Sequence, residues 1–195
     1  MRLSDNSLGV WLVLLLLIVV QVPLSIVALE SWALAAADVD ELEVGAEPGG
    51  GVHATAHPLF PAKPEVIQAL LSDYAHWPDL FEVRMKVVAL NVHDGVATID
   101  LRIDHPVMPG ERRLVTESRV LPNGGLVTDL KDGDFKRYHR VWKLQSAGDH
   151  TRADFELTVE PDSLAPDWLV AMVVRQELAA HFRIVKQKAL EHSKR

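Results

Sequence analysis

The sequence predicts an α+β domain in which an antiparallel sheet of about seven strands is covered by one long C-terminal helix. Three observations carry this prediction. Residues 83–160 alternate apolar and polar side chains in runs separated by turn signals, which is typical of antiparallel strands. Residues 168–191 instead place apolar side chains near helical spacing. No other predicted element is long enough to cover the apolar face of the sheet, so the last helix must pack on it.

The predicted strands are separated by short polar turns. Residues 96–105 alternate most regularly, with Ala97, Ile99 and Leu101 on one face and polar side chains on the other. Asp94-Gly95 before them is a hairpin signal. The predicted strands are residues 52–59, 83–92, 96–105, 112–121, 126–131, 135–144 and 151–160.

Helices are predicted on both sides of the main run of strands. Pro64 and the apolar residues that follow it indicate a helix over residues 65–71. Residues 73–81 form a second short helix or a turn, because Pro78 interrupts them. Asp167, after a proline, is suited to the N-cap or the first turn of the long final helix.

Composition excludes several classes of function. The chain has 195 residues, a formal net charge of −7 and no cysteine. A negative net charge argues against nucleic acid as a partner. The absence of cysteine excludes disulfides, thiolate catalysis and cysteine-based zinc sites. No cofactor is expected.

The N-terminus predicts export of the domain. Residues 8–29 are apolar and uncharged, long enough for a membrane span and followed by small residues near Ala35 and Ala37 that suit a signal peptidase. Residues 1–37 are therefore a signal peptide or a retained membrane anchor, and both alternatives stay open. Arg2 precedes the apolar segment and an acidic flank follows it, which places the rest of the chain outside the cytoplasm. Export without disulfides favours a bacterial periplasm, with possible contact to the inner membrane through residues 8–29.

Domain boundaries follow from composition. Residues 38–51 are acidic and then glycine-rich, so we expect a linker. One folded domain is expected over residues 52–195, a length that suits a single hydrophobic core.

Several local motifs accompany this order of elements. They are Pro64-Glu65-Val66, Asp73-Tyr74-x-x-Trp77-Pro78, Ser118-Arg119-Val120, Gly133-x-Phe135 with Trp142-x-Leu144, Thr151-Arg152 and Pro166-x-Trp168-Leu169-Val170. Together they resemble the START-like superfamily, also called SRPBCC, and within it the polyketide cyclase/dehydrase and coenzyme Q-binding branch. The resemblance covers residues 52–192. It implies the helix-grip fold, a curved sheet wrapped round the long helix with an apolar cavity between them.

Strand parity then selects candidate ligand-binding residues. The resemblance implies that Trp142 faces the cavity, and alternation puts Tyr138 and Arg140 on the same face. A charged guanidinium in an apolar cavity is costly unless it is paired. Arg140 either anchors an acidic group of a ligand, or lies at the cavity mouth or pairs with a structural carboxylate such as Glu117. The coenzyme Q-binding members commonly carry a small amide and apolar residues on this strand, so the chain departs from their pattern here.

Three further residues complete the candidate site. Phe155 lies on the apolar face of its strand. His105 has the same parity on an earlier strand, as a proton donor or as an ordinary partnered histidine. Met172 on the final helix either lines the cavity or packs on the sheet. No metal site is expected, because the nine histidines form neither H-x-H nor HExxH patterns.

The favoured function is binding or carriage of a hydrophobic small molecule or lipid. The apolar cavity supplies affinity, and a few polar groups set orientation. Two alternatives are a polyketide cyclase or aromatase and a non-catalytic, membrane-tethered interaction domain. Catalysis needs a positioned acid or base. The sequence offers few candidates for one, so an enzyme is not the favoured interpretation.

Overall fold

The computed structural model describes residues 41–105 and 110–193, and they form the predicted helix-grip fold. A nine-stranded antiparallel sheet has the order β1-β2-β9-β8-β7-β6-β5-β4, with β3 also paired to β9. The strands are β1 (Glu43–Ala46), β2 (Val52–Ala56), β3 (Leu59–Phe60), β4 (Arg84–His93), β5 (Val96–Asp104), β6 (Glu111–Val120), β7 (Gly125–Gly133), β8 (Phe135–Ala147) and β9 (His150–Pro161).

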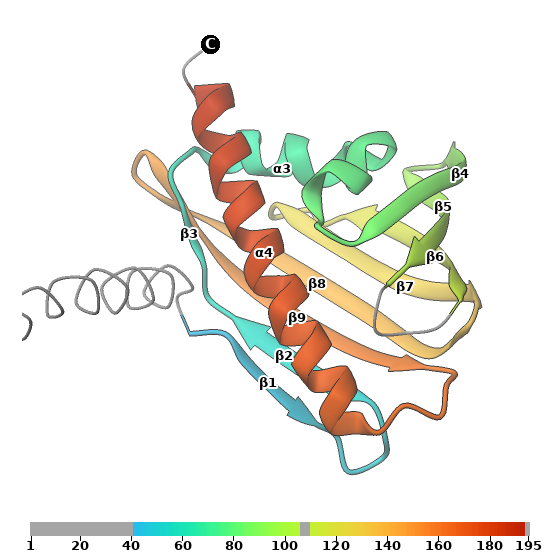
Figure 1. Ribbon diagram of the computed structural model, residues 1–195. Helices are drawn as coiled ribbons and strands as arrows, with labels where there is room; N and C mark the ends of the chain where they lie inside the picture. Colours follow the sequence, from blue (N-terminus) through green and yellow to red (C-terminus); the bar gives the residue numbers. More distant parts are fainter. Residues whose placement is uncertain (1–40, 106–109, 194–195) are drawn as a thin grey trace, which may run out of the picture. The chain divides into compact units, whose positions relative to one another are not determined.

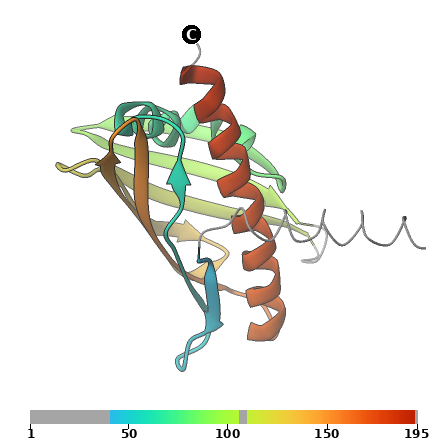
Figure 2. The same ribbon diagram turned by 90° about the vertical axis from the view of Figure 1, so that its left-hand side faces the viewer.

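One long helix covers the inner face of this curved sheet. Helix α4 (Asp167–Ser193) runs obliquely across the sheet in Figures 1 and 2. Helix α3 (Pro64–Ser72) and the 3₁₀ helix η1 (Tyr74–Leu80) lie beside its C-terminal half. An apolar sheet face must be buried against another element, and α4 supplies that cover as predicted.

The alternation predicted for the strands is confirmed. In β9 the odd-numbered residues from Thr151 to Val159 are buried, and the even-numbered residues between them are not. In β5, Ala97, Ile99 and Leu101 are buried in the same way. Their polar neighbours lie on the other face, where the guanidinium of Arg113 contacts the carboxylate of Asp100 at 2.9 Å. Period-2 patterning therefore determined which face of β5 and β9 is buried, whereas β6 buries three consecutive residues, Leu114 to Thr116, where its pairing with β7 is irregular.

The β4–β5 hairpin turns where Asp94-Gly95 predicted it. Asp94 has a φ of 50° and Gly95 a φ of 76°. Two consecutive residues with positive φ match the tight turn that suits the right-handed twist of antiparallel strands. Gly and Asp tolerate this backbone region better than most other residues.

The first part of the domain corrects two predictions. The strand expected over residues 52–59 is divided into β2 and β3, because Pro58 between them has no N–H to donate to a sheet partner. The linker expected over residues 38–51 contains β1, whose residues pair with β2 from Glu43↔Thr55 to Ala46↔Val52. Edge strands are commonly short, charged and exposed, so β1 has the composition of a linker although it belongs to the sheet.

The prediction for residues 1–37 lies outside the described residues. Among the residues that the structure does describe, no helix combines the length and the apolar character needed to cross a membrane.

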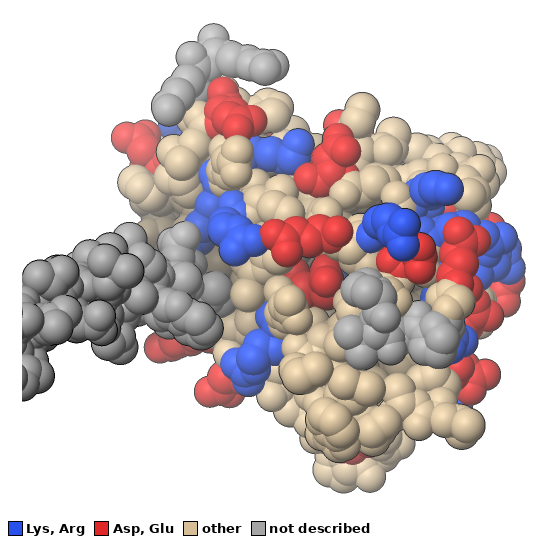
Figure 3. Space-filling model, viewed as in Figure 1, with Lys and Arg blue, Asp and Glu red and all other residues tan. Residues whose placement is uncertain are grey.

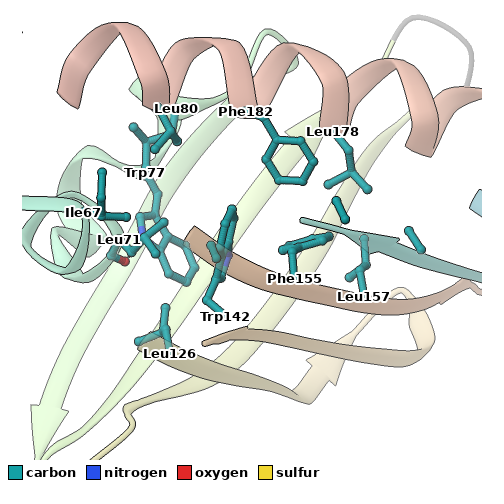
Figure 4. Close-up of a cluster of buried hydrophobic side chains, with 14 of the residues drawn as sticks. Ile67, Leu71, Trp77, Leu80, Leu126, Trp142, Phe155, Leu157, Leu178 and Phe182 are labelled. Atoms are coloured by element: carbon teal, nitrogen blue, oxygen red, sulfur yellow. The ribbon is translucent and has the colours of Figure 1, made fainter. Parts of the chain in front are cut away.

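A cluster of buried aromatic rings lies where α4 meets the middle of β8 and β9. Trp142 is fully buried, with ring centroids 4.7 Å from Phe155, 5.6 Å from Phe182 and 6.0 Å from Phe60. Figure 4 shows Trp142 and Phe155 directed from the sheet toward Phe182 of α4. Tilted and edge-on contacts of this kind are the preferred arrangements of aromatic rings.

Candidate functional site

A cavity of about 160 Å³ lies between the N-terminal half of α4 and the sheet. Most of its lining is apolar, and it comes from β4, β5, β6, β8, β9, η1, α4 and the segments next to them. The apolar and aromatic lining residues are Trp77, Phe81, Val83, Met85, Leu101, Ile103, Leu114, Phe135, Tyr138, Phe155, Leu157, Val159, Pro161, Ala165, Leu169, Val170, Val173, Val174 and Leu178. The other five are Arg140, His105, Glu177, His181 and Thr116. An apolar cavity with a few convergent polar groups is the usual form of a small-molecule site.

Arg140 is the central polar group of this cavity. It lies in β8 with Tyr138 and Trp142 at the same parity, and only 6% of its surface is exposed. Its guanidinium carbon lies 4.6 Å from the ring centroid of Trp77. The ring is held in place because Trp77 Nε1 donates a hydrogen bond to Leu71 O at 2.8 Å. This cation–π contact orients the guanidinium, although Nε of Arg140 has no hydrogen-bond partner among the described residues.

Within residues 41–105 and 110–193, no carboxylate pairs with Arg140. The partner suggested from the sequence, Glu117, instead accepts a hydrogen bond from Lys131 Nζ at 2.6 Å and is partly exposed. The pairing alternative with Glu117 is therefore wrong. Burial of a cation without a counter-anion is costly, so the site is electrostatically complementary to an anion.

A second polar group, Glu177, lines the same cavity from α4. Its Oε1 lies 3.4 Å from His105 Nε2, and the side chain of His105 is 8% exposed. Its other oxygen, Oε2, is buried without a hydrogen-bond partner among the described residues. The cavity thus holds a carboxylate–imidazole pair in addition to Arg140.

His181 lies one helical turn after Glu177 and is buried. Its Nδ1 donates a hydrogen bond to Leu80 O at 2.8 Å, and its ring stacks on Phe81 at a centroid distance of 4.3 Å. Burial, and to a smaller extent the positive charge of Arg140, lower the pKa of His181 to about 3. The imidazole is therefore neutral near pH 7, with its proton on Nδ1 and an acceptor lone pair on Nε2.

Tyr74 provides a second sign that the charge of Arg140 acts in this region. Burial raises the pKa of Tyr74 above its ordinary value, and the positive charge of Arg140 opposes that rise. The Tyr74 ring packs edge-on against Trp77 at 5.2 Å. Tyr74 thus supports the ring on which the guanidinium rests.

The structure brings four of the six predicted site residues to the cavity. Tyr138, Arg140, Phe155 and His105 all line it. Trp142 shares their parity but does not line the cavity, because Phe60, Phe155 and Phe182 surround its ring in the core. Parity gives the face of a strand but not the position along it where the core ends.

Met172 is the other correction. It is 51% exposed and lies away from the cavity. Val170 and Val173 face inward, and a residue two positions after Val170 is turned by about 200° round the helix axis. Met172 is therefore on the solvent side of α4.

The candidate residues selected from the sequence did not include Trp77, Glu177 or His181, which provide the cation–π contact and two of the polar groups of the cavity. The signal for the last two was available on α4. A face that begins at Val170 and Val173 continues at i+7 and i+11 from Val170, at Glu177 and His181. The prediction from the sequence did not extend this face of the helix to Glu177 and His181.

The described part of the chain holds no group of three or more His, Asp or Glu residues that is suited to a metal ion. His53 and His57, which share a strand face, each pair with a carboxylate instead: His53 with Glu156 at 3.2 Å and His57 with Asp154 at 3.0 Å. The surface shown in Figure 3 mixes Lys and Arg with Asp and Glu and has no basic patch of the kind that binds nucleic acid.

Comparison with known proteins identifies the family. The family described as polyketide cyclase / dehydrase and lipid transport matches residues 60–181. The chain belongs to this family. All of the cavity-lining residues fall within the matched residues. No curated protein matches the chain in sequence.

Solved structures show the same fold. A protein of Thermus thermophilus is 23% identical with a TM-score of 0.60, over 72% of this chain and 99% of that one. A START superfamily protein from Mycobacterium smegmatis is 19% identical with a TM-score of 0.58, over 71% and 97%. The Zhui aromatase/cyclase from a Streptomyces species is 9% identical with a TM-score of 0.55, over 73% and 93%. This family member therefore shares its fold with START proteins and with an aromatase/cyclase.

Proposed function

We propose that this domain binds and carries an apolar small molecule or lipid that has one acidic end. The observation that supports the proposal is the buried guanidinium of Arg140, which lines an apolar cavity. It has no carboxylate partner among the described residues. Burial of apolar ligand surface contributes about 25 cal/mol per Å². The charged hydrogen bond adds orientation and contributes roughly 1.5 to 3 kcal/mol.

The local geometry suits an anion better than a neutral ligand. The guanidinium carbon lies over the ring of Trp77, which is itself held by its hydrogen bond to Leu71 O. Nε of Arg140 has no hydrogen-bond partner among the described residues, and a planar guanidinium matches the two oxygens of a carboxylate. A place within the coenzyme Q-binding branch of the family stays a prediction.

Two fluorescent probes test the proposal. 1-Anilinonaphthalene-8-sulfonate carries an anionic group on an apolar aromatic frame, and N-phenyl-1-naphthylamine has the same frame without it. Fluorescence titration measures both affinities. Arg140→Met should weaken the sulfonate probe by about 10- to 150-fold, the equivalent of one charged hydrogen bond. The affinity of the neutral probe should change by less than about 3-fold, because its burial is unaffected.

Arg119→Met is the matched control. It removes the same charge from an exposed position, where Arg119 pairs with Asp129 at 2.9 Å. Its sulfonate affinity should stay near that of the unsubstituted protein. A sulfonate affinity that survives Arg140→Met, together with a lower melting temperature, would mean that Arg140 is structural and would refute the proposal.

We propose further that the domain works outside the cytoplasm, in a bacterial periplasm, as a soluble protein or anchored through residues 8–29. The apolar segment and the acidic flank after it support this. An alkaline phosphatase fused after Arg195 should be active and a green fluorescent protein dark. The reverse pattern would refute export. The mass of the mature chain then distinguishes cleavage near Ala35 or Ala37 from a retained anchor.

A further inference from the structure

Glu177 is a cavity group that the proposed anion site leaves unused. Its side chain projects from α4 and is 24% exposed, and Oε1 is positioned by His105 Nε2 at 3.4 Å. Oε2 is buried and accepts no hydrogen bond from the described residues. An ionised carboxylate only accepts hydrogen bonds, so a donor must satisfy this oxygen. A buried acceptor that stays unpaired costs free energy.

Arg140, the charged hydrogen-bond donor of the cavity, does not pair with Glu177. Arg140 rests on Trp77 and forms no ion pair with Glu177 in the described part of the chain. Opposite charges in an apolar cavity attract strongly. These two nevertheless form no pair with each other: Arg140 lies over Trp77, and Glu177 contacts His105. The cavity therefore has two polar positions of opposite chemistry.

His181 strengthens the accepting character of the second position. It follows Glu177 by four residues on the same face of α4, and both line the cavity. Because its Nδ1–H donates to Leu80 O, Nε2 is left as an acceptor, and it has no partner among the described residues. Two unsatisfied acceptors on one helix face favour a ligand group that donates hydrogen bonds.

We propose that the ligand carries a hydrogen-bond donor, foremost a hydroxyl group, that Glu177 Oε2 accepts, in addition to the acidic end that Arg140 binds. The ligand class is thus an apolar hydroxy acid rather than a simple fatty acid or hydrocarbon. This inference rests on the proposed function, since it assumes that the cavity takes a ligand at all. Glu177 contributes to specificity, and His105 positions its carboxylate.

Alkanoates provide flexible probes, because their two ends adapt to the spacing of the two polar positions. Displacement of N-phenyl-1-naphthylamine from the full domain is measured for decanoate, 10-hydroxydecanoate and 10-methoxydecanoate, and for the corresponding acids of eight and twelve carbons. The methoxy acids keep the oxygen but cannot donate. At one chain length or more, the hydroxy acid should bind about 10-fold more tightly than its methoxy counterpart.

Substitution of Glu177 tests the residue itself. Glu177→Leu should remove the hydroxy-over-methoxy preference while the decanoate affinity changes by less than about 3-fold, because decanoate has no donor for this position. Glu177→Gln keeps the size and one acceptor, so it should retain part of the preference even where the leucine variant folds poorly. Gln176→Leu, at the exposed neighbouring residue, is the matched control and should leave the preference unchanged.

The possible failures are distinguishable. Equal affinity for hydroxy and methoxy acids at all three lengths, or a preference that survives Glu177→Leu, would overturn the donor position while the proposed acid binding stands. 1-Decanol has the same chain as decanoate without the acidic group. If the ratio of the decanoate affinity to the 1-decanol affinity were the same in Arg140→Met as in the unsubstituted protein, the proposed function itself would fail. If instead that variant weakened all the acids by a similar factor and kept the hydroxy preference, both positions would be supported as independent.

Discussion

The two halves of the space under α4 have the same architecture but opposite contents. The half toward the C-terminus of α4 is filled by Trp142, Phe60 and Phe182, all fully buried. The half toward its N-terminus contains the cavity: α4 contributes small side chains such as Val170, Val173 and Val174 there, and rings such as Phe155 and Tyr138 line the opposite wall from the sheet. A sheet and a helix that diverge leave space between them, and the volumes of the side chains decide whether that space is core or cavity.

The largest effect is expected from removing the central ring of the packed half. Trp142→Ala should destabilise the domain by about 3 to 5 kcal/mol, because the ring contacts three aromatic neighbours and the site cannot collapse fully. Urea unfolding measures this. Phe135→Ala, at the half-buried cavity lining, is the comparison and should cost clearly less. Equal costs would mean that the two halves do not differ in packing.

The same valine-to-phenylalanine substitution, made at two positions of α4, compares the two halves directly. Val185 is fully buried in the packed half, so Val185→Phe should destabilise by about 1 to 3 kcal/mol through overpacking. Val173, twelve residues earlier, faces the cavity, and Val173→Phe should cost less than about 1 kcal/mol and weaken both naphthalene probes about 10-fold or more. Thermal melting and fluorescence titration measure the two effects. A Val173→Phe variant that still bound both probes normally would show that they bind elsewhere.

The boundary between the halves contains His181, which makes stability depend on pH. Its folded pKa of about 3 lies below its ordinary value of 6.5, so between these values the unfolded chain binds a proton that the folded chain does not. The free energy of unfolding should therefore fall as pH falls below 6.5, by up to about 1.4 kcal/mol per pH unit from this residue.

His181→Gln removes that ionisation, so the fall between pH 6 and pH 5 should become shallower by about that slope, whatever constant stability the variant loses. His76 is the control of opposite sign. Its hydrogen bond to Asp73 raises its pKa, so it stabilises the fold at low pH, and His76→Gln should not make the fall shallower. An unchanged slope in His181→Gln would contradict the buried neutral imidazole.

The smallest effect distinguishes two buried threonines of neighbouring strands. Thr128 Oγ1 is 2.9 Å from Ser118 Oγ, whereas Thr116 Oγ1 lines the cavity without a partner in the described residues. Thr128→Val should destabilise by about 1 kcal/mol, because Ser118 is left unpaired. Thr116→Val should be neutral or stabilising by a similar amount, because an unsatisfied hydroxyl is removed. Denaturant unfolding measures the stability of both variants. A Thr116→Val variant that is less stable than Thr128→Val would contradict this prediction.

Periodicity by itself determined the sheet, the covering helix and the inward faces of strands such as β5 and β9. Ala97, Ile99 and Leu101 in β5 and the alternating residues of β9 are buried as predicted. Local patterns suffice here, because the direction of a strand side chain depends only on parity. The same rule placed Arg140, Tyr138 and Phe155 on the cavity face before any tertiary contact was known.

Only the tertiary structure decided which inward residues line a cavity and which fill the core. Trp142 and Arg140 share a strand face two residues apart, yet Trp142 is packed by aromatic rings and Arg140 faces the cavity beside Trp77. Glu177 meets His105 from a position 72 residues away in the chain. Such outcomes depend on how far α4 lies from the sheet at each position and on the volumes of side chains from six or more elements. A periodic pattern reports neither of these two quantities. The pattern of each element is set by its own local sequence, whereas the space between elements depends on how they pack together.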